Sequence, residues 1–228
     1  MISRPLAITF AGFALLGAAV LGAFVYDRTH PKPIAAPAAA SVAAVQPALA
    51  PAMADATVPA VRPDVSLPDP EGKSHSIREW DGKTLLVNFW ATWCAPCRRE
   101  MPLLSRIRQE YAAKGVEIVG IAVDVVADVK SYLAKSPVRY PVLVGEQEGI
   151  DAARDFGVTE PVFPFTVFLD SKGRVLLIHV GELHEPMARA ILAVALDPKT
   201  VTLGPDEARA AVKAAVAALP AEPATPTG

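Results

Sequence analysis

The chain has 228 residues, with 22 basic and 24 acidic side chains and a formal net charge of -2. That length accommodates one ordinary domain with additional segments. The balanced charge provides no broad positive field, so we do not expect nucleic acid to be a partner. Two cysteines are too few for a disulfide-stapled miniature scaffold or for a zinc site of four thiolates. They can still form one redox-active pair.

Residues 5–26 form an uncharged run rich in Leu, Ala, Val, Phe and Gly. A helix of this length crosses a hydrocarbon layer about 30 Å thick, so we predict an N-terminal transmembrane anchor over residues 1–26. A cleaved signal peptide is the alternative, but the run is longer than the usual apolar part of such signals and lacks a small-x-small cleavage pattern at its end. The basic residues on the two sides nearly balance, so charge alone does not orient the anchor.

Residues 27–63 are predicted to be a Pro/Ala-rich linker. Prolines interrupt the segment repeatedly, and half of the positions 35–60 are alanine. Such a composition has little to bury and favours coil and extended polyproline conformations. The segment would act as a tether between the anchor and the rest of the chain.

From residue 64 onward, the pattern alternates between strands and helices. Residues 84–90 form a compact apolar run typical of a strand buried on both faces. An amphipathic helix is predicted to follow over 95–114, with Gly115 ending it. A helix between two strands requires a parallel crossover, whereas the last two strands form an antiparallel hairpin. We therefore predict an α/β domain over 64–197, a mixed central sheet flanked by helices, whose further elements are strand 116–123, helix 128–135, strand 141–144, helix 151–156, strands 165–169 and 174–180, and helix 187–196.

Residues 198–228 are predicted to be a C-terminal appendage with a short helix and a disordered tail. The helix begins near Gly204 and Pro205 and carries a stripe of small apolar side chains. Because this stripe offers little area to bury, a weak helix that docks on its own domain or frays is favoured over a dimerisation element.

Cys94 and Cys97 lie directly after the buried strand and on the first turn of the predicted helix. This spacing brings two thiols within disulfide range, while the free amides of the helix point at the first sulfur. The positive helix end stabilises a thiolate, so Cys94 is the expected nucleophile. Cys97, one turn further in, is expected to resolve the mixed disulfide formed with a substrate. Pro96, between them, restricts the loop.

The segment NFWATWCAPCRREMP, residues 88–102, resembles the active-site region of the membrane-anchored, thioredoxin-like oxidoreductases of the TlpA/ResA group. The similarity extends over roughly residues 64–197 and implies a thioredoxin-like fold. It also implies that Trp93, Ala95 and Pro96 border the substrate.

The segment from Phe163 to Thr166 resembles the cis-proline segment of the same fold. The resemblance implies that Pro164 is cis and lies against the disulfide, where the backbone before it can pair with a substrate strand. Pro161 is the competing candidate. Phe163 also borders the substrate by this resemblance, and it is bulkier than the residue commonly found there, which affects partner preference.

Thioredoxin itself has a buried acid where this chain has Asn88, and an amide cannot carry the proton of the inner cysteine. The TlpA/ResA motif has an acid at the position of Glu100, and the i, i+3 spacing places Glu100 on the helix face of Cys97. Glu100 is therefore expected to move that proton. The alternative is an ordinary solvated carboxylate in a charged run.

The cysteine pair has two alternative interpretations. A metal-binding, copper-delivery module would need further ligands from His75, His179 or His184, which are expected in a turn, a strand and a loop and are spread singly along the chain. An inert structural disulfide across two intervening residues would constrain the unfolded chain little. Neither a resident metal nor a cofactor is expected.

The resemblance implies a single-pass protein of the inner (cytoplasmic) membrane with its catalytic domain in the periplasm or another extracytoplasmic space. Proteins of this group reduce specific protein disulfides for cytochrome c maturation or copper-centre assembly. The implied partners are disulfide-containing substrates such as apocytochrome c or copper-site proteins, and a DsbD-like or CcdA-like membrane electron donor. The residues themselves do not set the redox direction.

Overall fold

The computed structural model describes residues 58–220. The predicted anchor, nearly all of the predicted linker and the end of the predicted tail lie outside this range. Within residues 58–220, no helix combines the length and the apolar character needed to cross a bilayer.

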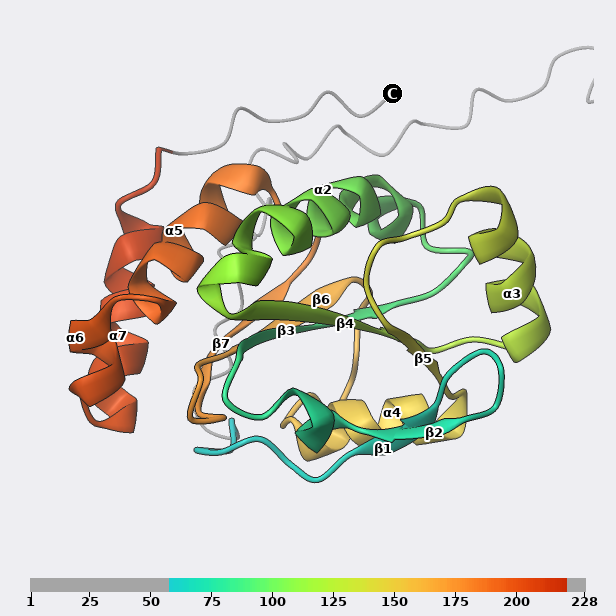
Figure 1. Cartoon of the computed structure of the whole chain (residues 1–228), viewed down its shortest axis with the longest axis horizontal. Helices are drawn as coiled ribbons and strands as arrows, with labels where there is room; N and C mark the ends of the chain where they lie inside the picture. Colours follow the sequence, from blue (N-terminus) through green and yellow to red (C-terminus); the bar gives the residue numbers. More distant parts are fainter. Residues whose placement is uncertain (1–57, 221–228) are drawn as a thin grey trace, which may run out of the picture. The chain divides into compact units, whose positions relative to one another are not determined.

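A five-stranded sheet in the order β5-β4-β3-β6-β7 forms the centre of the domain (Figure 1). The central strand β3 is buried along its whole length, which explains its continuous apolar sequence. It pairs in parallel with β4 and antiparallel with β6, so the predicted mixed sheet with a parallel crossover and a final hairpin is confirmed. The strands are β3 (Thr84–Trp90), β4 (Val116–Ala122), β5 (Val142–Val144), β6 (Phe165–Leu169) and β7 (Val175–Val180).

Helices cover both faces of this sheet (Figure 1). One buried cluster joins one face to side chains of α2 (Ala95–Tyr111), α3 (Val126–Lys135), α5 (Glu185–Ala195) and α7 (Pro205–Ala217). A second cluster joins the other face to α4 (Gln147–Asp155). The predicted helix 95–114 is observed as α2 and a short 3-10 turn, η2 (Ala112–Lys114), ended by Gly115 in the left-handed conformation.

A small hairpin, which the sequence pattern did not predict, packs on the α4 face. It consists of β1 (Ser66–Pro68) and β2 (Ser74–Ser76) and leads into a 3-10 turn, η1 (Ile77–Trp80). Ser76 caps this turn in a reciprocal capping box with Glu79. Ile77 and Trp80 are buried, so the hairpin belongs to the core of the domain.

Contacts with the domain begin before the predicted boundary at residue 64. Val61 forms an isolated antiparallel bridge with Arg174, and the Arg62 amide donates to the Gly173 carbonyl at 2.8 Å. Val58 packs against the buried cluster of the α4 face. Residues 58–63, assigned to the linker from composition, are therefore part of the folded unit.

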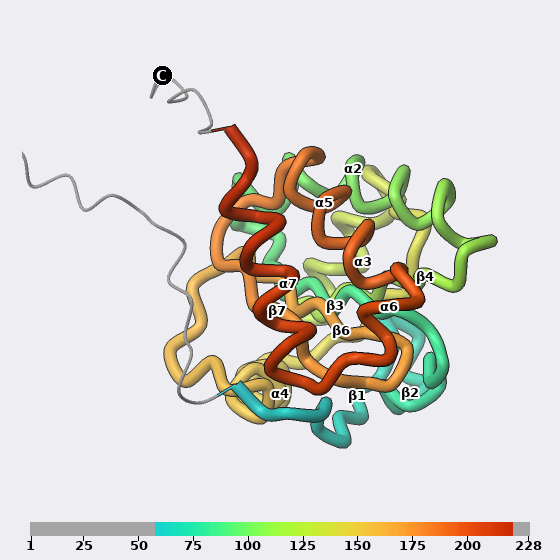
Figure 2. Tube along the Cα trace, turned by 90° about the vertical axis from the view of Figure 1, so that its left-hand side faces the viewer, coloured from blue at the N-terminus to red at the C-terminus, as the bar shows by residue number. Residues whose placement is uncertain are grey.

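The C-terminal region docks on its own domain, as favoured from the sequence. α7 lies against β7 and α5 (Figure 2) and buries Ala208 and Val212. A preceding helix, α6 (Pro198–Thr202), was not predicted. The buried Arg174 side chain donates to the carbonyls of Thr200 and Leu203 and so ties this region to the start of β7. Residues 198–217 are part of the domain and not a separate appendage.

Candidate active site

The register of the sheet brings the candidate residues to one edge. Cys94 follows the end of β3, and β6 begins after Pro164 with Phe165 paired to Phe89 of β3. β7 ends at Val180, which pairs with Phe165. The loop after β7 and the segment before β6 therefore lie at the same edge as the start of α2.

Cys94 and Cys97 form a disulfide, with their Cα atoms 5.3 Å apart. Cys94 is the N-cap of α2, and its Sγ accepts a hydrogen bond from the Cys97 amide at 3.2 Å. Cys94 is 5% exposed and Cys97 is fully buried. Cys94 is thus the outer sulfur and Cys97 the inner one. Ala95 is exposed between them and Pro96 is half-buried.

Two residues that were not predicted as part of the site, Asp124 and Arg98, hold the loop before Cys94. The carboxylate of Asp124, just beyond β4, accepts hydrogen bonds from the Thr92 amide at 2.8 Å and the Thr92 hydroxyl at 2.6 Å. The Arg98 guanidinium donates to the Thr92 carbonyl at 2.7 Å. An acid directly after a strand parallel to β3 was the available signal, because carboxyl ends of parallel strands meet at one edge.

The Phe163–Pro164 peptide bond is cis, which confirms that prediction for Pro164. The Phe163 ring meets the Trp93 ring edge to face, with the centroids 6.1 Å apart. Trp93 is 67% exposed, and Phe163 is half-buried. The cis-proline segment and the cysteine loop therefore lie side by side and share an aromatic surface.

Glu100 is buried on the face of α2 that packs against the sheet, at 2% exposure. The alternative of a solvated carboxylate is therefore wrong. Its Oε1 accepts from the Asn88 amide nitrogen at 2.7 Å and its Oε2 from the Leu183 backbone amide at 2.5 Å. Burial raises the pKa of Glu100 to about 7; these two hydrogen bonds oppose the rise, and the nearby charge of Glu182 adds to it.

Asn88 connects Glu100 to the cis-proline strand. Its Nδ2 donates to Glu100 and also to the Thr166 hydroxyl oxygen at 3.0 Å. Asn88 and Thr166 are cross-strand partners on β3 and β6, and both are fully buried. Asn88 cannot carry a proton itself, but it is thus a direct partner of the Glu100 carboxyl group.

The loop after β7 is fastened to α2 at two points. The Leu183 amide donates to Glu100, and the Glu182 carboxylate accepts three hydrogen bonds from the Arg99 guanidinium, the shortest of them at 2.5 Å. Sequence patterns could not reveal the Leu183 contact, because any residue provides a backbone amide.

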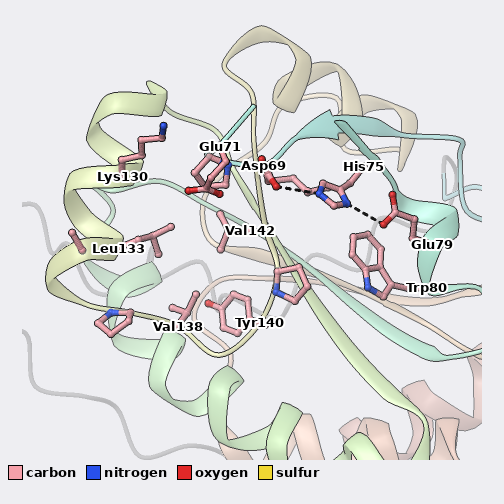
Figure 3. Close-up of a pocket in the computed structure, with 15 residues that line it drawn as sticks. Asp69, Glu71, His75, Glu79, Trp80, Lys130, Leu133, Val138, Tyr140 and Val142 are labelled. Atoms are coloured by element: carbon pink, nitrogen blue, oxygen red, sulfur yellow. Dashed lines mark hydrogen bonds and ion pairs between the residues drawn. The ribbon is translucent and has the colours of Figure 1, made fainter. Parts of the chain in front are cut away.

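A cavity of about 790 Å³ lies away from the cysteine pair, between the β1–β2 hairpin and α3 (Figure 3). None of the residues around the disulfide lines it. Figure 3 shows His75 between two carboxylates: Nε2 is 3.1 Å from Asp69 and Nδ1 is 2.9 Å from Glu79. The hydrogen bond to Glu79, followed by that to Asp69, raises the pKa of His75. His75, expected in a turn, lies in β2.

The three histidines considered as metal ligands do not join the cysteines in a ligand set. His179 lies in β7 and His184 is the N-cap of α5. Across residues 58–220, no three His, Cys, Asp or Glu side chains are grouped so that they could hold a metal ion.

Comparisons with known proteins agree with this geometry. A profile of the Redoxin family matches residues 54–196. Thioredoxin-like protein YneN of Bacillus subtilis is 36% identical over 127 residues, which cover 53% of this chain and 70% of that protein. Thiol-disulfide oxidoreductase ResA of Halalkalibacterium halodurans is 30% identical over 127 residues, covering 55% of this chain and 70% of that protein.

Solved structures show the same fold. A Chlorobium tepidum protein assigned as the thiol:disulfide interchange protein DsbE superposes with a TM-score of 0.55 at 30% identity, covering 61% of this chain and 99% of that one. A secreted thiol-disulfide isomerase from Corynebacterium glutamicum gives a TM-score of 0.52 at 27% identity, covering 59% and 83%. With the Cys94–Cys97 disulfide at the start of α2, the chain belongs to the Redoxin family and is a thioredoxin-like thiol-disulfide oxidoreductase of the TlpA/ResA type.

Proposed function

We propose that this protein reduces specific protein disulfides in an extracytoplasmic space while residues 1–26 anchor it in the inner membrane. The observation that carries the proposal is the Cys94–Cys97 pair at a helix start, with its inner sulfur on the same helix face as a buried carboxyl group. The uncharged run 5–26 and the resemblance to membrane-anchored relatives support the tether.

The first step of the proposed reaction is attack by Cys94. In the reduced protein, the amides at the start of α2 favour the Cys94 thiolate over the thiol. This sulfur attacks one sulfur of a substrate disulfide; the substrate S–S bond breaks, and its other sulfur leaves as a thiolate. A mixed disulfide then joins Cys94 to the substrate.

The second step uses Cys97 and Glu100. The ionised Glu100 carboxyl takes the proton of the Cys97 thiol, and the resulting thiolate attacks Cys94 Sγ. The bond between Cys94 and the substrate breaks, and the substrate leaves as its second thiolate. The substrate has gained two electrons, and the protein is left with the Cys94–Cys97 disulfide seen in the structure. A pKa of about 7 suits a group that must accept and release a proton near neutral pH.

Trp93, Phe163 and Pro164 are proposed to hold the substrate. Trp93 presents an exposed aromatic ring beside the disulfide, and Phe163 adds a second ring in contact with it. Aromatic side chains supply large apolar area at low entropic cost in protein interfaces. The backbone before the cis proline is proposed to pair with an extended substrate segment that carries the disulfide.

The proposed substrates are disulfides of apocytochrome c or of copper-site proteins, and the proposed donor that reduces Cys94–Cys97 again is a DsbD-like or CcdA-like membrane protein. Both rest on the resemblance to the TlpA/ResA group. A copper-delivery module without redox turnover is not favoured, because the two cysteines are bonded to each other and have no further ligands beside them in residues 58–220.

Trapping in membranes tests this proposal. A full-length Cys97→Ser protein should retain its substrates on Cys94 as mixed disulfides, which can be released with a reductant and identified. The matched Cys94→Ser protein should trap none, since it lacks the outer nucleophile. Equal recovery from the two variants would exclude the dithiol mechanism. A phosphatase fused after Gly228 should be active only if the domain is extracytoplasmic.

A further inference from the structure

Asn88 lies at the junction of α2, β3 and β6 with no access to solvent. Its Nδ2 uses both hydrogens, one toward Glu100 Oε1 and one toward the Thr166 hydroxyl. Its Oδ1 is buried and has no hydrogen-bond partner among residues 58–220. An unpaired buried acceptor costs free energy, so the arrangement calls for a physical explanation.

The proton that Glu100 accepts has only one suitable position. Oε2 faces the Leu183 backbone amide, which donates in every protonation state. A proton on Oε2 would make that oxygen a weaker acceptor for the Leu183 N–H, so the proton belongs on Oε1, the oxygen that faces Asn88. The O–H group would then meet an N–H group of Asn88, and two donors cannot bond to each other.

Rotation of the Asn88 amide by half a turn removes this conflict. It exchanges Nδ2 and Oδ1, which are nearly equal in size, so that Oδ1 accepts from the protonated Glu100. The Thr166 hydroxyl follows without moving its oxygen, because a hydroxyl both accepts and donates. Oδ1 then has two partners, and Nδ2 takes the position at which no partner lies, so the rotation exchanges an unpaired acceptor for an unpaired donor and avoids the contact between two donors at Glu100.

We propose that Asn88 is a positioning residue that holds Glu100 in both of its protonation states by reversing its side-chain amide, with Thr166 reversing its hydroxyl in step. Glu100 thereby keeps one place beside Cys97 while its proton comes and goes. This inference rests on the proposed role of Glu100 as a proton carrier.

Other groups near Glu100 bear on its titration. Glu182 in the loop after β7 adds a negative charge, and Arg99 neutralises part of it through their ion pair. Tyr140, between α3 and β5, feels the charge of Glu100. His179 is the cross-strand partner of Thr166, and Cys97 lies one turn earlier on α2. Asn88 donates its hydrogen bonds to Glu100 and Thr166, so the amide reversal should follow the protonation of Glu100.

Nuclear magnetic resonance of the oxidised full-length protein in detergent micelles tests the reversal directly. Above the Glu100 midpoint, the Asn88 amide hydrogens should show cross-relaxation with hydrogens of Thr166. Below it, that signal should disappear, and the amide shifts should move with the same midpoint as the Glu100 carboxyl carbon. An Asn88 signal that stays constant while Glu100 titrates would overturn the proposal.

Two variants sharpen the test. Asn88→Leu removes the amide at similar size and should raise the Glu100 midpoint by about one pH unit, because both protonation states lose a hydrogen bond and the bond to the charged form is the stronger one. Thr166→Val is the matched control; it removes one contact from each state and should shift the midpoint less. If Asn88→Leu does not fold, the cross-relaxation in the wild type still decides. A midpoint that rises by about two pH units or more in a folded Asn88→Leu protein contradicts the proposal, because it would mean that Asn88 stabilises only the charged form.

The proposed role of Glu100 as a proton carrier is tested by a separate measurement. It is contradicted if the pH dependence of mixed-disulfide resolution does not follow the Glu100 midpoint. The behaviour of the Asn88 amide across that midpoint is decided by the resonance signals in either case.

Discussion

Glu100 at the disulfide edge and His75 beside the hairpin cavity both have a raised pKa, for opposite reasons. Burial among apolar side chains disfavours the charged form of Glu100, although two hydrogen bonds counteract it. Two carboxylates hold the charged form of His75 in place, and burial acts against them. The fold therefore disfavours the charged form of Glu100 and favours the charged form of His75.

This difference shows how the two regions relate to stability. Between pH about 4.5 and about 7, folded Glu100 binds more protons than unfolded Glu100, so it lowers the free energy of unfolding as pH rises through that window. His75 also binds more protons when folded. Its stabilisation is complete below its unfolded pKa of 6.5 and is lost as pH rises through its higher folded pKa. The buried carboxyl group beside the disulfide therefore reduces stability when it is ionised. The protonated histidine beside the hairpin increases stability.

The largest expected effect is on reductase activity, which should depend on the disulfide edge and not on the hairpin cavity. Cys94→Ser should abolish reduction of insulin disulfides with dithiothreitol as donor, because a hydroxyl cannot replace the thiolate nucleophile. His75→Gln should leave this activity unchanged, since neither cysteine, nor Glu100, nor the aromatic pair beside them lines the cavity. Turnover by Cys94→Ser, or loss of turnover in a folded His75→Gln protein, would contradict the assignment of the reaction to the disulfide edge alone.

Replacing the buried carboxyl should change stability with a defined pH dependence. At pH 8, Glu100→Gln should be more stable than the wild type by about 3 kcal/mol, because it has no ionised form to desolvate. The difference should vanish below pH about 4.5. Urea unfolding of both proteins from pH 4 to 8 measures it, and parallel stability curves would contradict the assigned cause.

The same substitution should slow the chemistry. Resolution of the mixed disulfide should fall about a hundredfold in Glu100→Gln, the scale expected for loss of a general base. In the wild type, the rate should rise as pH passes about 7 and the carboxylate forms; in the variant, this step should be missing. Quenched-flow measurement of the mixed disulfide checks both the rate and its pH dependence. If the rise in rate near pH 7 persists in Glu100→Gln, another group is responsible for it.

The smallest expected effect concerns His75. His75→Gln should lower the midpoint temperature of unfolding at pH 5.5, where the protonated ring lies between Asp69 and Glu79. The difference in midpoint temperature between wild type and His75→Gln should shrink as pH rises. The stability difference between wild type and Glu100→Gln should grow over the same change in pH. A His75→Gln difference that grows with pH would show that the ring is held in its neutral form.

Much of the fold was predictable because its signals are local. The apolar run of β3, the helix that begins after Cys94 and the final hairpin follow from periodicity, capping and turn residues within each segment. The β1–β2 hairpin and α6 were missed because their short segments, unlike β5, contain no apolar run and are too short to show periodicity. They are held by tertiary contacts such as burial of Ile77 and the Arg174 hydrogen bonds.

The features of the candidate site also fall into those that the sequence predicts and those that only the structure shows. The sequence by itself determined the cysteine pair at a helix start and the face that Glu100 shares with Cys97, since each depends on a few neighbouring residues. The cis-proline segment followed from the resemblance to the TlpA/ResA group. Only the tertiary structure decided that Glu100 is buried, that the Leu183 amide binds it, and that Asn88 and Asp124 support the site. These contacts join residues as much as 83 positions apart, and one of them uses a backbone amide that every sequence provides.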